Sequence, residues 1–518
     1  MLLILVALLS SGLIQALISP PLNWTLLHVM SWVPAFWVFS RLSGRRAFLA
    51  GWLVGTSANL AIFYWLIFTA HNFLGIPMLI TPLVLLFFAL GIGLYVAVFA
   101  WGFQYIRNIT AGAWPFAIAI WFCALEFIMP QLFTYYQGVA WYQHPEVFLV
   151  TSLTGVSGMS FLVILCNALV LQAIEVMLEG RKSSRALFNN VAVFALLLLL
   201  TFTYSTHRLT EIERAEADAR AIKIVIIQPN HNVQIKQQLH RQSPDSFARD
   251  LVTLSREVTD TMFGPGCIDV YIWPENALPK PPRDASNRLV IDFARQSGAE
   301  IWTGALFQDS HQVNTGVYHN TAFRIDSNGE IDTRYDKTLL IPFGEYVPLK
   351  GVLPGLDWIR LPGNFEAGDG LRIFSSEWAK FSFLICYEAI KSSFVRTGIQ
   401  GGAEILVNIS GDARSGDHSE QSQHLMLAAI QAAQFGVPLV RSTSTGISAF
   451  VDARGLITAQ TRVFERGGLV QWVQPLRVPS FYAQYGDWFA WVCVIVSILL
   501  LTAVGRIKFI ARRAINQS

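Results

Sequence analysis

The distribution of positive charge and apolar segments in the first 204 residues constrains this chain of 518 residues more than any other feature. That part contains only seven Lys or Arg residues and a succession of apolar segments, many of them close to the ~20 residues that a helix needs to cross about 30 Å of hydrocarbon. We therefore expect a membrane bundle over 1–204, with spans near 2–18, 25–39, 48–70, 78–101, 114–129, 153–177 and 191–204. An eighth span is expected near 486–505.

The cationic residues also predict the orientation of the bundle. They fall only in the connections after the second, fourth and sixth spans, at Arg41, Arg45, Arg46, Arg107, Arg181, Lys182 and Arg185. Short loops that carry such charges stay in the cytoplasm, so we expect cytoplasmic termini, with 506–518 as a tail, and an exported segment between the seventh and eighth spans. A cleaved signal peptide is the competing interpretation of residues 1–19, although no basic stretch precedes them and six further spans follow.

The exported segment changes character after a polar linker at 205–221. Strands are expected near 222–228, 270–273, 300–307, 318–325, 381–386, 405–409, 439–442, 446–452 and 469–472. Helices are expected near 246–261, 284–297, 391–400 and 420–435. This alternation predicts an α/β domain of layered sheets with outer helices over 222–480. The expected fold class is thus a multi-pass α-helical membrane bundle with an α/β domain inserted between its seventh and eighth transmembrane helices.

One cysteine lies at the end of a predicted buried strand. In the run F-S-F-L-I-C-Y-E-A-I at 381–390, Cys386 ends the apolar run and precedes a predicted helix. The first free N–H groups of that helix would favour thiolate over thiol. An unpaired cysteine is, however, more often a small buried hydrophobe. Cys267 is the other exported cysteine, and the two could form a disulfide, because that compartment is oxidising.

Two further strand ends carry ionisable residues. In V-Y-I-W-P-E-N-A-L-P a buried strand runs into Glu275, and in Y-D-K-T-L-L-I-P-F-G-E-Y-V-P an apolar loop is flanked by Lys337 and Glu345. Taken singly, Glu275 is typical of a turn and Lys337 of a solvated surface. Together with Cys386 they supply a base, a cation and a nucleophile, which acyl transfer through a thioester requires.

The motifs W-P-E-N-A-L-P, K-T-L-L-I-P-F-G-E-Y-V-P and I-C-Y-E, in this order, resemble the Glu, Lys and Cys motifs of the nitrilase superfamily. The multi-pass N-terminal part and the single C-terminal span narrow the resemblance to the apolipoprotein N-acyltransferase family. The resemblance implies a nitrilase-like α-β-β-α sandwich in a periplasmic domain of the bacterial inner membrane. It also implies ping-pong acyl transfer, from a membrane phospholipid to the α-amine of a diacylglyceryl-modified apolipoprotein, without a cofactor.

The resemblance also assigns roles to residues. Glu275 is expected to act as the base, Cys386 as the nucleophile, and Lys337, with the backbone N–H of Tyr387, as the oxyanion stabiliser. The active-site support expected from the resemblance comprises Glu345, Tyr387 and Glu388, of which Glu345 and Glu388 would hold Lys337 and Glu275 in their working geometry.

Two other features are candidates for substrate contact. The loop G-V-L-P-G-L-D-W-I-R-L-P-G-N-F at 351–365 would expose a set of apolar side chains suited to a membrane interface or an acyl-chain lid: Leu356, Trp358, Ile359 and Leu361. A loop packed on the core is the alternative. Arg441, in V-P-L-V-R-S-T-S-T-G-I-S-A, matches a family segment and could instead pair with an acidic residue.

Several other classes of function find little support. The net charge of +3, without a basic stripe, argues against a nucleic-acid partner. His418 and His424 stand six apart on a polar stretch, which does not indicate a metal site, and no G-x-S-x-G motif indicates a serine hydrolase. A membrane-tethered amidase and a non-catalytic transporter or receptor remain as alternatives. Glu126, inside an apolar span, is either functional or hydrated near the outer interface.

Overall fold

The structure, a computed structural model, describes the chain except for residues 180–183, 261–267, 310–316, 333, 349–363, 413–417 and 516–518. Its residues form two compact units. The helical unit comprises Met1–Tyr64, Pro82–Arg208 and Gln484–Ser518, and the α/β unit comprises Trp65–Thr81 and Leu209–Ala483. The candidate lid residues lie outside the described residues: Leu356, Trp358, Ile359 and Leu361.

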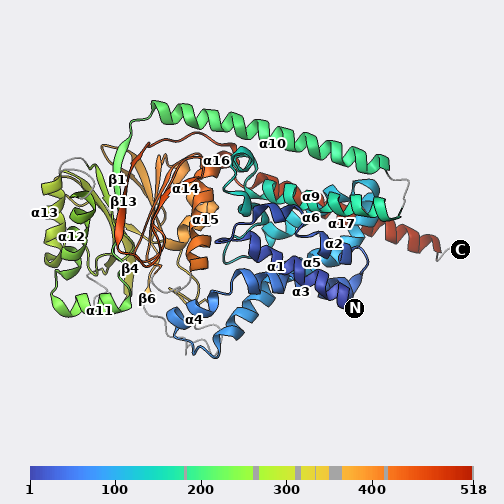
Figure 1. The fold of residues 1–518 in the computed structure, drawn as a ribbon, viewed down its shortest axis with the longest axis horizontal. Coiled ribbons are helices and arrows are strands. Elements are labelled where there is room, and N and C mark those ends of the chain that lie inside the picture. The colour runs from blue at the N-terminus through green and yellow to red at the C-terminus, as the bar shows by residue number, and fades with distance from the viewer. Residues whose placement is uncertain are drawn as a thin grey trace. The chain divides into compact units, whose positions relative to one another are not determined.

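The helical unit consists of apolar helices near the predicted spans, with the exception of the third (Figure 1). Its main helices are α1 (Leu2–Ile18), α2 (Val33–Phe39), α3 (Gly44–Ile62), α5 (Thr81–Thr110), α6 (Trp114–Ile128), α9 (Val156–Glu179), α10 (Ser184–Asp218) and α17 (Trp488–Ile515). Short helices connect them at η1 (Thr25–Val29), η2 (Ala111–Ala113), η3 (Gln137–Trp141), α7 (Pro145–Phe148) and α8 (Thr151–Thr154). Within the described residues, three helical stretches are long and apolar enough to cross a membrane, and a bent pair would add a fourth. Other apolar helices, such as α1, are shorter.

The core of the helical unit is built largely from aromatic rings. Phe99 contacts Phe122 edge to face with ring centroids 5.0 Å apart, and Phe36 packs on Phe103 at 5.3 Å. Glu126 lies in this interior at 1% exposure, where its Oε1 accepts a hydrogen bond of 2.6 Å from the backbone N–H of Gln137. The carboxylate is thus enclosed by protein, which disfavours the hydrated alternative for Glu126.

The third predicted span differs from the structure. The sequence suggested one helix over 48–70, but α3 ends at Ile62, and the chain bends by 59° into α4 (Leu66–Leu74), which belongs to the α/β unit. At the bend Phe63 stacks on Phe133, with centroids 5.8 Å apart, and Trp65 Nε1 donates a hydrogen bond of 3.0 Å to Gln423 Oε1. These side-chain contacts outweigh continuation of an apolar helix.

The α/β unit contains two sheets. The first has the strand order β13-β1-β2-β3-β4-β5, with β6 also on β4, and the second has the order β12-β11-β10-β9-β8-β7. Their strands are β1 (Ile222–Gln228), β2 (Val270–Ile272), β3 (Glu300–Phe307), β4 (Val317–Ile325), β5 (Tyr335–Asp336), β6 (Asn364–Phe365), β7 (Ile373–Ser375), β8 (Lys380–Ile385), β9 (Ile405–Ser410), β10 (Leu439–Thr443), β11 (Ala449–Val451), β12 (Ile457–Gln460) and β13 (Gly467–Val473). Every predicted strand is present, with boundaries shifted by a few residues.

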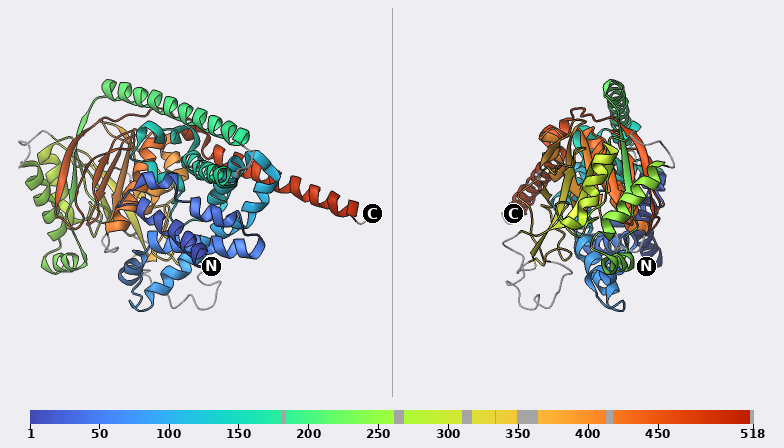
Figure 2. Two further views of the ribbon diagram at one scale, coloured as in Figure 1. Left: turned by 45° about the vertical axis from the view of Figure 1, so that its right-hand side comes forward. Right: turned by 90° about the vertical axis from the view of Figure 1, so that its left-hand side faces the viewer.

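Helices cover the outer faces of both sheets, so the unit is an α-β-β-α sandwich (Figures 1 and 2). The helices are α11 (Val233–Gln242), α12 (Ser246–Asp260), η4 (Ala285–Asn287), α13 (Arg288–Ser297), η5 (Cys386–Ile390), α14 (Ser392–Gln400), α15 (His418–Phe435) and α16 (Phe481–Tyr485). Apolar side chains of α12 and α13 form one core with the first sheet. A second core lies between the sheets and receives alternate residues of β8, since successive strand residues point to opposite faces.

The strand β1 pairs in parallel with β2, and β2 with β3, while β8, β9 and β10 are parallel in the second sheet. Parallel neighbours end at the same edge of their sheet. The segments that follow β2, β8, β9 and β10 therefore gather chemically active residues from distant parts of the sequence.

A prediction follows from the contact between the sheets. Trp302 of β3 is fully buried, and its ring stacks on Phe381 of β8 with centroids 3.7 Å apart. Trp302→Ala should destabilise the α/β unit by about 3–5 kcal/mol, because it leaves a large cavity. The temperature at which that unit unfolds should fall accordingly. Trp472→Ala is the matched control, since Trp472 is 53% exposed, and an equal effect of both variants would contradict this account.

Candidate active site

Cys386 follows β8 directly and begins η5. Its backbone φ of 53° is left-handed, which is strained for a residue with a Cβ. Its thiol is free and only partly exposed, whereas Cys267 lies outside the described residues. Burial raises the pKa of the Cys386 thiol well above its usual value, Glu275 raises it further, and Lys337 lowers it. The expectation that the following helix favours the thiolate is therefore wrong for this state, because burial and a neighbouring carboxylate prevail.

Glu275 follows β2 in a turn that packs against β3. Gly304 permits this contact, since a Cβ there would lie 2.7 Å from the Glu275 Cα. The Glu275 Oε1 accepts a hydrogen bond of 2.6 Å from Asn320 Nδ2, and Oε2 accepts one of 2.6 Å from the Gly411 N–H. Burial raises the pKa of the Glu275 carboxyl, and Lys337 opposes that shift. The site thus contains a carboxylate with a higher affinity for protons than an exposed glutamate has.

Lys337 follows β5 and is almost completely buried. Its Nζ donates a hydrogen bond of 2.8 Å to Glu345 Oε1 and lies 4.0 Å from Glu275 Oε1. Burial by itself lowers the pKa of Lys337, but the charges of Glu345 and Glu275 raise it above its usual value. The side chain is therefore an ammonium ion close to the base.

Glu345 and Glu388 hold different parts of this arrangement. Glu345 binds the ammonium through Oε1, and its Oε2 accepts a hydrogen bond of 2.9 Å from the Ile341 N–H. Glu388 is fully buried, and its oxygens accept hydrogen bonds of 2.7 Å from Tyr335 Oη and from the N–H groups of Thr338 and Ile385. Burial raises the pKa of Glu388 to about 7. Glu388 thus joins the segment after Lys337 to the strand that ends at the nucleophile.

The other candidate residues are also placed within the α/β unit. Tyr387 is mostly buried, and the Lys391 Nζ lies 4.8 Å from the centroid of its ring. Arg441 of β10 is fully buried and donates hydrogen bonds to Asn408, Asp412 and the Ile447 carbonyl.

The sequence did not indicate the two partners of the Glu275 carboxylate. Asn320 is a fully buried amide inside strand β4. Because buried polar groups are seldom left without a partner, an amide in this predicted strand carried a usable signal. Gly411 offers only a backbone N–H, which no residue pattern could have identified.

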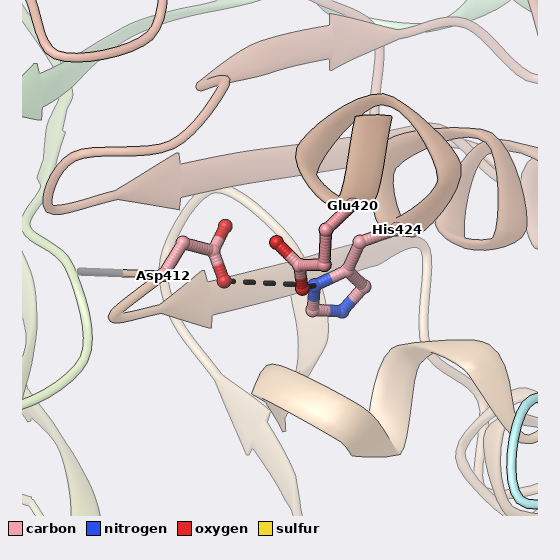
Figure 3. Close-up of side chains that lie close together, drawn as sticks. All are labelled: Asp412, Glu420 and His424. Carbon is pink, nitrogen blue, oxygen red and sulfur yellow. Dashed lines mark ion pairs between the residues drawn. The ribbon is translucent and has the colours of Figure 1, made fainter. Parts of the chain in front are cut away.

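Asp412, Glu420 and His424 bring ligand-type atoms within 4.8 Å of one another (Figure 3). The Arg441 guanidinium, however, donates from Nη2 to Asp412 Oδ2 at 2.6 Å and approaches His424 Nδ1 at 3.1 Å. A bound cation would have to approach this positive charge. Asp412 is therefore better described as the ion-pair partner of Arg441 than as one of a set of metal ligands with Glu420 and His424.

The family models and the relatives similar in sequence agree on one family. The model of the apolipoprotein N-acyltransferase N-terminal domain matches residues 11–169, and the carbon-nitrogen hydrolase model matches residues 223–478. Apolipoprotein N-acyltransferases of Geobacter metallireducens and Pseudomonas syringae are 28% and 29% identical to this chain. The first alignment covers 93% of this chain and 92% of the relative, and the second covers 96% and 95%. The Nit3 structure from Saccharomyces cerevisiae, of the nitrilase superfamily, aligns with 49% of this chain and 91% of its own at a TM-score of 0.38 and 15% identity.

The two matched domains follow one another in the order that the sequence predicts, and the full-length relatives share one name. The chain therefore belongs to the apolipoprotein N-acyltransferase family, with a catalytic domain of the carbon-nitrogen hydrolase type.

Proposed function

We propose that this chain moves a fatty acyl group from a membrane phospholipid, through a thioester on Cys386, to the α-amine of an N-terminal diacylglyceryl-cysteine in an apolipoprotein. The observation that carries the proposal is the buried arrangement of Glu275 and Lys337, whose charged atoms lie 4.0 Å apart and both act electrostatically on the Cys386 thiol. Family membership supports the acyltransferase activity.

In the first half-reaction Glu275 removes the proton of Cys386 as the sulfur attacks the ester carbonyl. The Lys337 ammonium, with the Tyr387 backbone N–H, stabilises the negative charge that develops on the carbonyl oxygen. As the tetrahedral intermediate breaks down, the C–O bond to the lipid glycerol is cleaved. Glu275 returns its proton to that oxygen, so lysophospholipid leaves and the acyl group remains on sulfur.

In the second half-reaction the α-amine of the apolipoprotein attacks the thioester carbonyl. Glu275 accepts a proton from the attacking nitrogen and returns it to the departing sulfur, which restores the thiol. An ester becomes a thioester and then an amide, the most stable of the three acyl linkages. The sequence of steps therefore needs no ATP and no cofactor.

Both substrates are lipids, so the site has to be reached from a membrane surface. The segment after Lys337 exposes Phe343 and Tyr346 on either side of Glu345, at 44% and 40%. Within the same unit, Leu79 in the Trp65–Thr81 segment is 92% exposed. Exposed apolar side chains of this kind suit contact with acyl chains. We place the helical unit in the bacterial inner membrane, the α/β unit in the periplasm and both termini in the cytoplasm.

A membrane-tethered amidase is the second candidate, because the same trio could let water resolve the thioester. The apolar helices of the helical unit favour the acyltransferase, since a soluble substrate would require no such bundle. The two reactions differ in the fate of the acyl group, which a direct measurement can follow.

Cys386→Ser should reduce acyl transfer to background while the protein stays folded and inserted, because a hydroxyl is a much weaker nucleophile than a thiol here.

Purified wild-type protein mixed with phospholipid should gain the mass of one acyl group on Cys386, and an apolipoprotein N-terminal peptide should remove it as an amide. Cys166→Ser, at a partly buried cysteine of α9, should behave as wild type. Full activity of Cys386→Ser would exclude the thioester, and release of free fatty acid alone would favour the amidase.

The raised pKa of Glu275 predicts the pH dependence of thioester formation. Below that pKa the carboxyl is protonated and cannot take the thiol proton, so the single-turnover rate should rise with pH through a value above that of an ordinary glutamate. Glu275→Gln should lower the rate by about 10²–10⁴-fold and abolish this acid limb.

Glu377→Gln is the matched control, because Glu377 is exposed in the turn between β7 and β8. It should keep both the rate and the pH profile of wild type. An unchanged acid limb in Glu275→Gln would show that another group is the base.

A further inference from the structure

We propose that Arg441, Asp412, His424 and Asn408 form a buried cluster, named here the Arg441 cluster, that positions the nucleophile and the base together. The inference rests on the proposed function and deepens it. It assigns Arg441 a positioning role in place of substrate contact.

Arg441 is the centre of the cluster. It is fully buried on β10, and its guanidinium binds three side chains from three other places in the unit. Nη2 donates to Asp412 Oδ2 at 2.6 Å and to His424 Nδ1 at 3.1 Å, and Nη1 donates to Asn408 Oδ1. Nε donates to the Ile447 carbonyl at 3.3 Å. These bonds occupy the guanidinium with protein partners, and its burial separates it from substrate.

One branch of the cluster leads to the nucleophile. A guanidinium can only donate hydrogen bonds, so the contact of 3.1 Å with Arg441 Nη2 favours His424 Nδ1 as an acceptor over the longer contact of 3.5 Å between Nδ1 and Asp412 Oδ1. The ring proton of the neutral imidazole then lies on Nε2. Nε2 is 3.3 Å from the carbonyl oxygen of Cys386, to which it donates. Asn408 Nδ2 donates to the same oxygen at 3.5 Å and to the Leu384 carbonyl at 2.7 Å. The cluster thus holds the backbone of Cys386 in its strained left-handed conformation.

The other branch leads to the base. Asp412 pairs with Arg441, and the turn that carries it is held by Ser410 Oγ, which donates to Asp412 Oδ1 at 2.6 Å. Gln421 Nε2 of α15 donates to the Asp412 carbonyl at 3.0 Å. The residue before Asp412 is Gly411, whose N–H donates to Glu275 Oε2. Anchoring Asp412 therefore fixes the direction of the hydrogen bond that orients the carboxylate of the base.

The charge states agree with this geometry. Burial alone would raise the pKa of Asp412, but the Arg441 charge dominates and lowers it well below its usual range. Burial lowers the pKa of His424, and Arg441 lowers it further, against the opposing effect of Asp412. Asp412 is thus a carboxylate and His424 a neutral imidazole, as the hydrogen bonds require.

The test compares His424→Leu, His424→Gln and Arg441→Lys in the full-length protein in detergent. His424→Leu removes the donor to the Cys386 carbonyl, whereas Gln can still donate. His424→Leu should slow thioester formation from phospholipid by about 10- to 100-fold at an unchanged KM, since small misplacements of reacting groups cost rates of this size. His424→Gln should recover part of that loss. Arg441→Lys should also be slowed, because an ammonium cannot reproduce the planar set of donors.

A second readout needs no lipid. The rate at which iodoacetamide alkylates Cys386 should follow a pH profile that is displaced in His424→Leu and Arg441→Lys, because the thiol and its base are no longer held together. Arg324→Lys is the matched control. Arg324 donates to the buried Glu300 and to Asp332 elsewhere in the same unit. Its substitution should lower the unfolding temperature and leave both the acylation rate and the alkylation profile unchanged.

Three outcomes separate the possibilities. A wild-type rate and profile in His424→Leu would overturn the proposal, and so would a rise in KM alone, which would indicate substrate contact. An alkylation profile displaced equally by Arg324→Lys would reduce the cluster to a general contribution to stability and would also overturn it. If phospholipid never acylates wild-type Cys386, but His424→Leu still displaces the alkylation profile, the proposed function fails and the positioning role stands.

Discussion

The active site depends on one buried ammonium ion that lies between two carboxylates. Lys337 donates to Glu345 at 2.8 Å and lies 4.0 Å from Glu275. A buried charge is costly without partners, and with these partners the group carries one excess negative charge. Burial already disfavours a thiolate, and a second excess negative charge would disfavour it further, so the pKa of the Cys386 thiol is raised. The sulfur is then activated only when an acyl carbonyl can accept its electrons, and a neutral thiol is less open to oxidation between turnovers.

Much of this arrangement could be predicted from the sequence, because it follows from local patterns. The alternation in F-S-F-L-I places Phe381, Phe383 and Ile385 in the core between the sheets, and the next residue has to leave the strand. The same reasoning locates Glu275 at a strand end, after the apolar run that begins at Val270. Ionisable residues that directly follow apolar runs are informative, since a buried charge needs a compensating partner nearby.

The hydrogen-bond partners of the active-site residues could not be predicted, because they come from distant segments of the chain. The partners of Glu275 come from positions 320 and 411, and the donors to the Cys386 carbonyl come from positions 408 and 424. The chain also turns after Ile62 where apolar composition alone favoured a continuing helix. The pKa of the Cys386 thiol could not be predicted for the same reason. The local helix start suggested a lowered pKa, whereas burial and the distant carboxylate of Glu275 raise it.

The division of the site between two sheets explains why so many buried hydrogen bonds surround it. Glu275 and Lys337 belong to the sheet of β2 and β5, whereas Cys386 follows β8 in the other sheet. Packing of Trp302 on Phe381 holds the two sheets together, but a stacked pair of rings does not fix how one sheet is shifted along the other. The Tyr335 hydroxyl of the first sheet donates to Glu388, and the Gly411 N–H, which follows the second sheet's β9, donates to Glu275. Each sheet thus contributes a donor that fixes a residue of the other. The catalytic geometry is therefore a property of the whole sandwich rather than of any one loop.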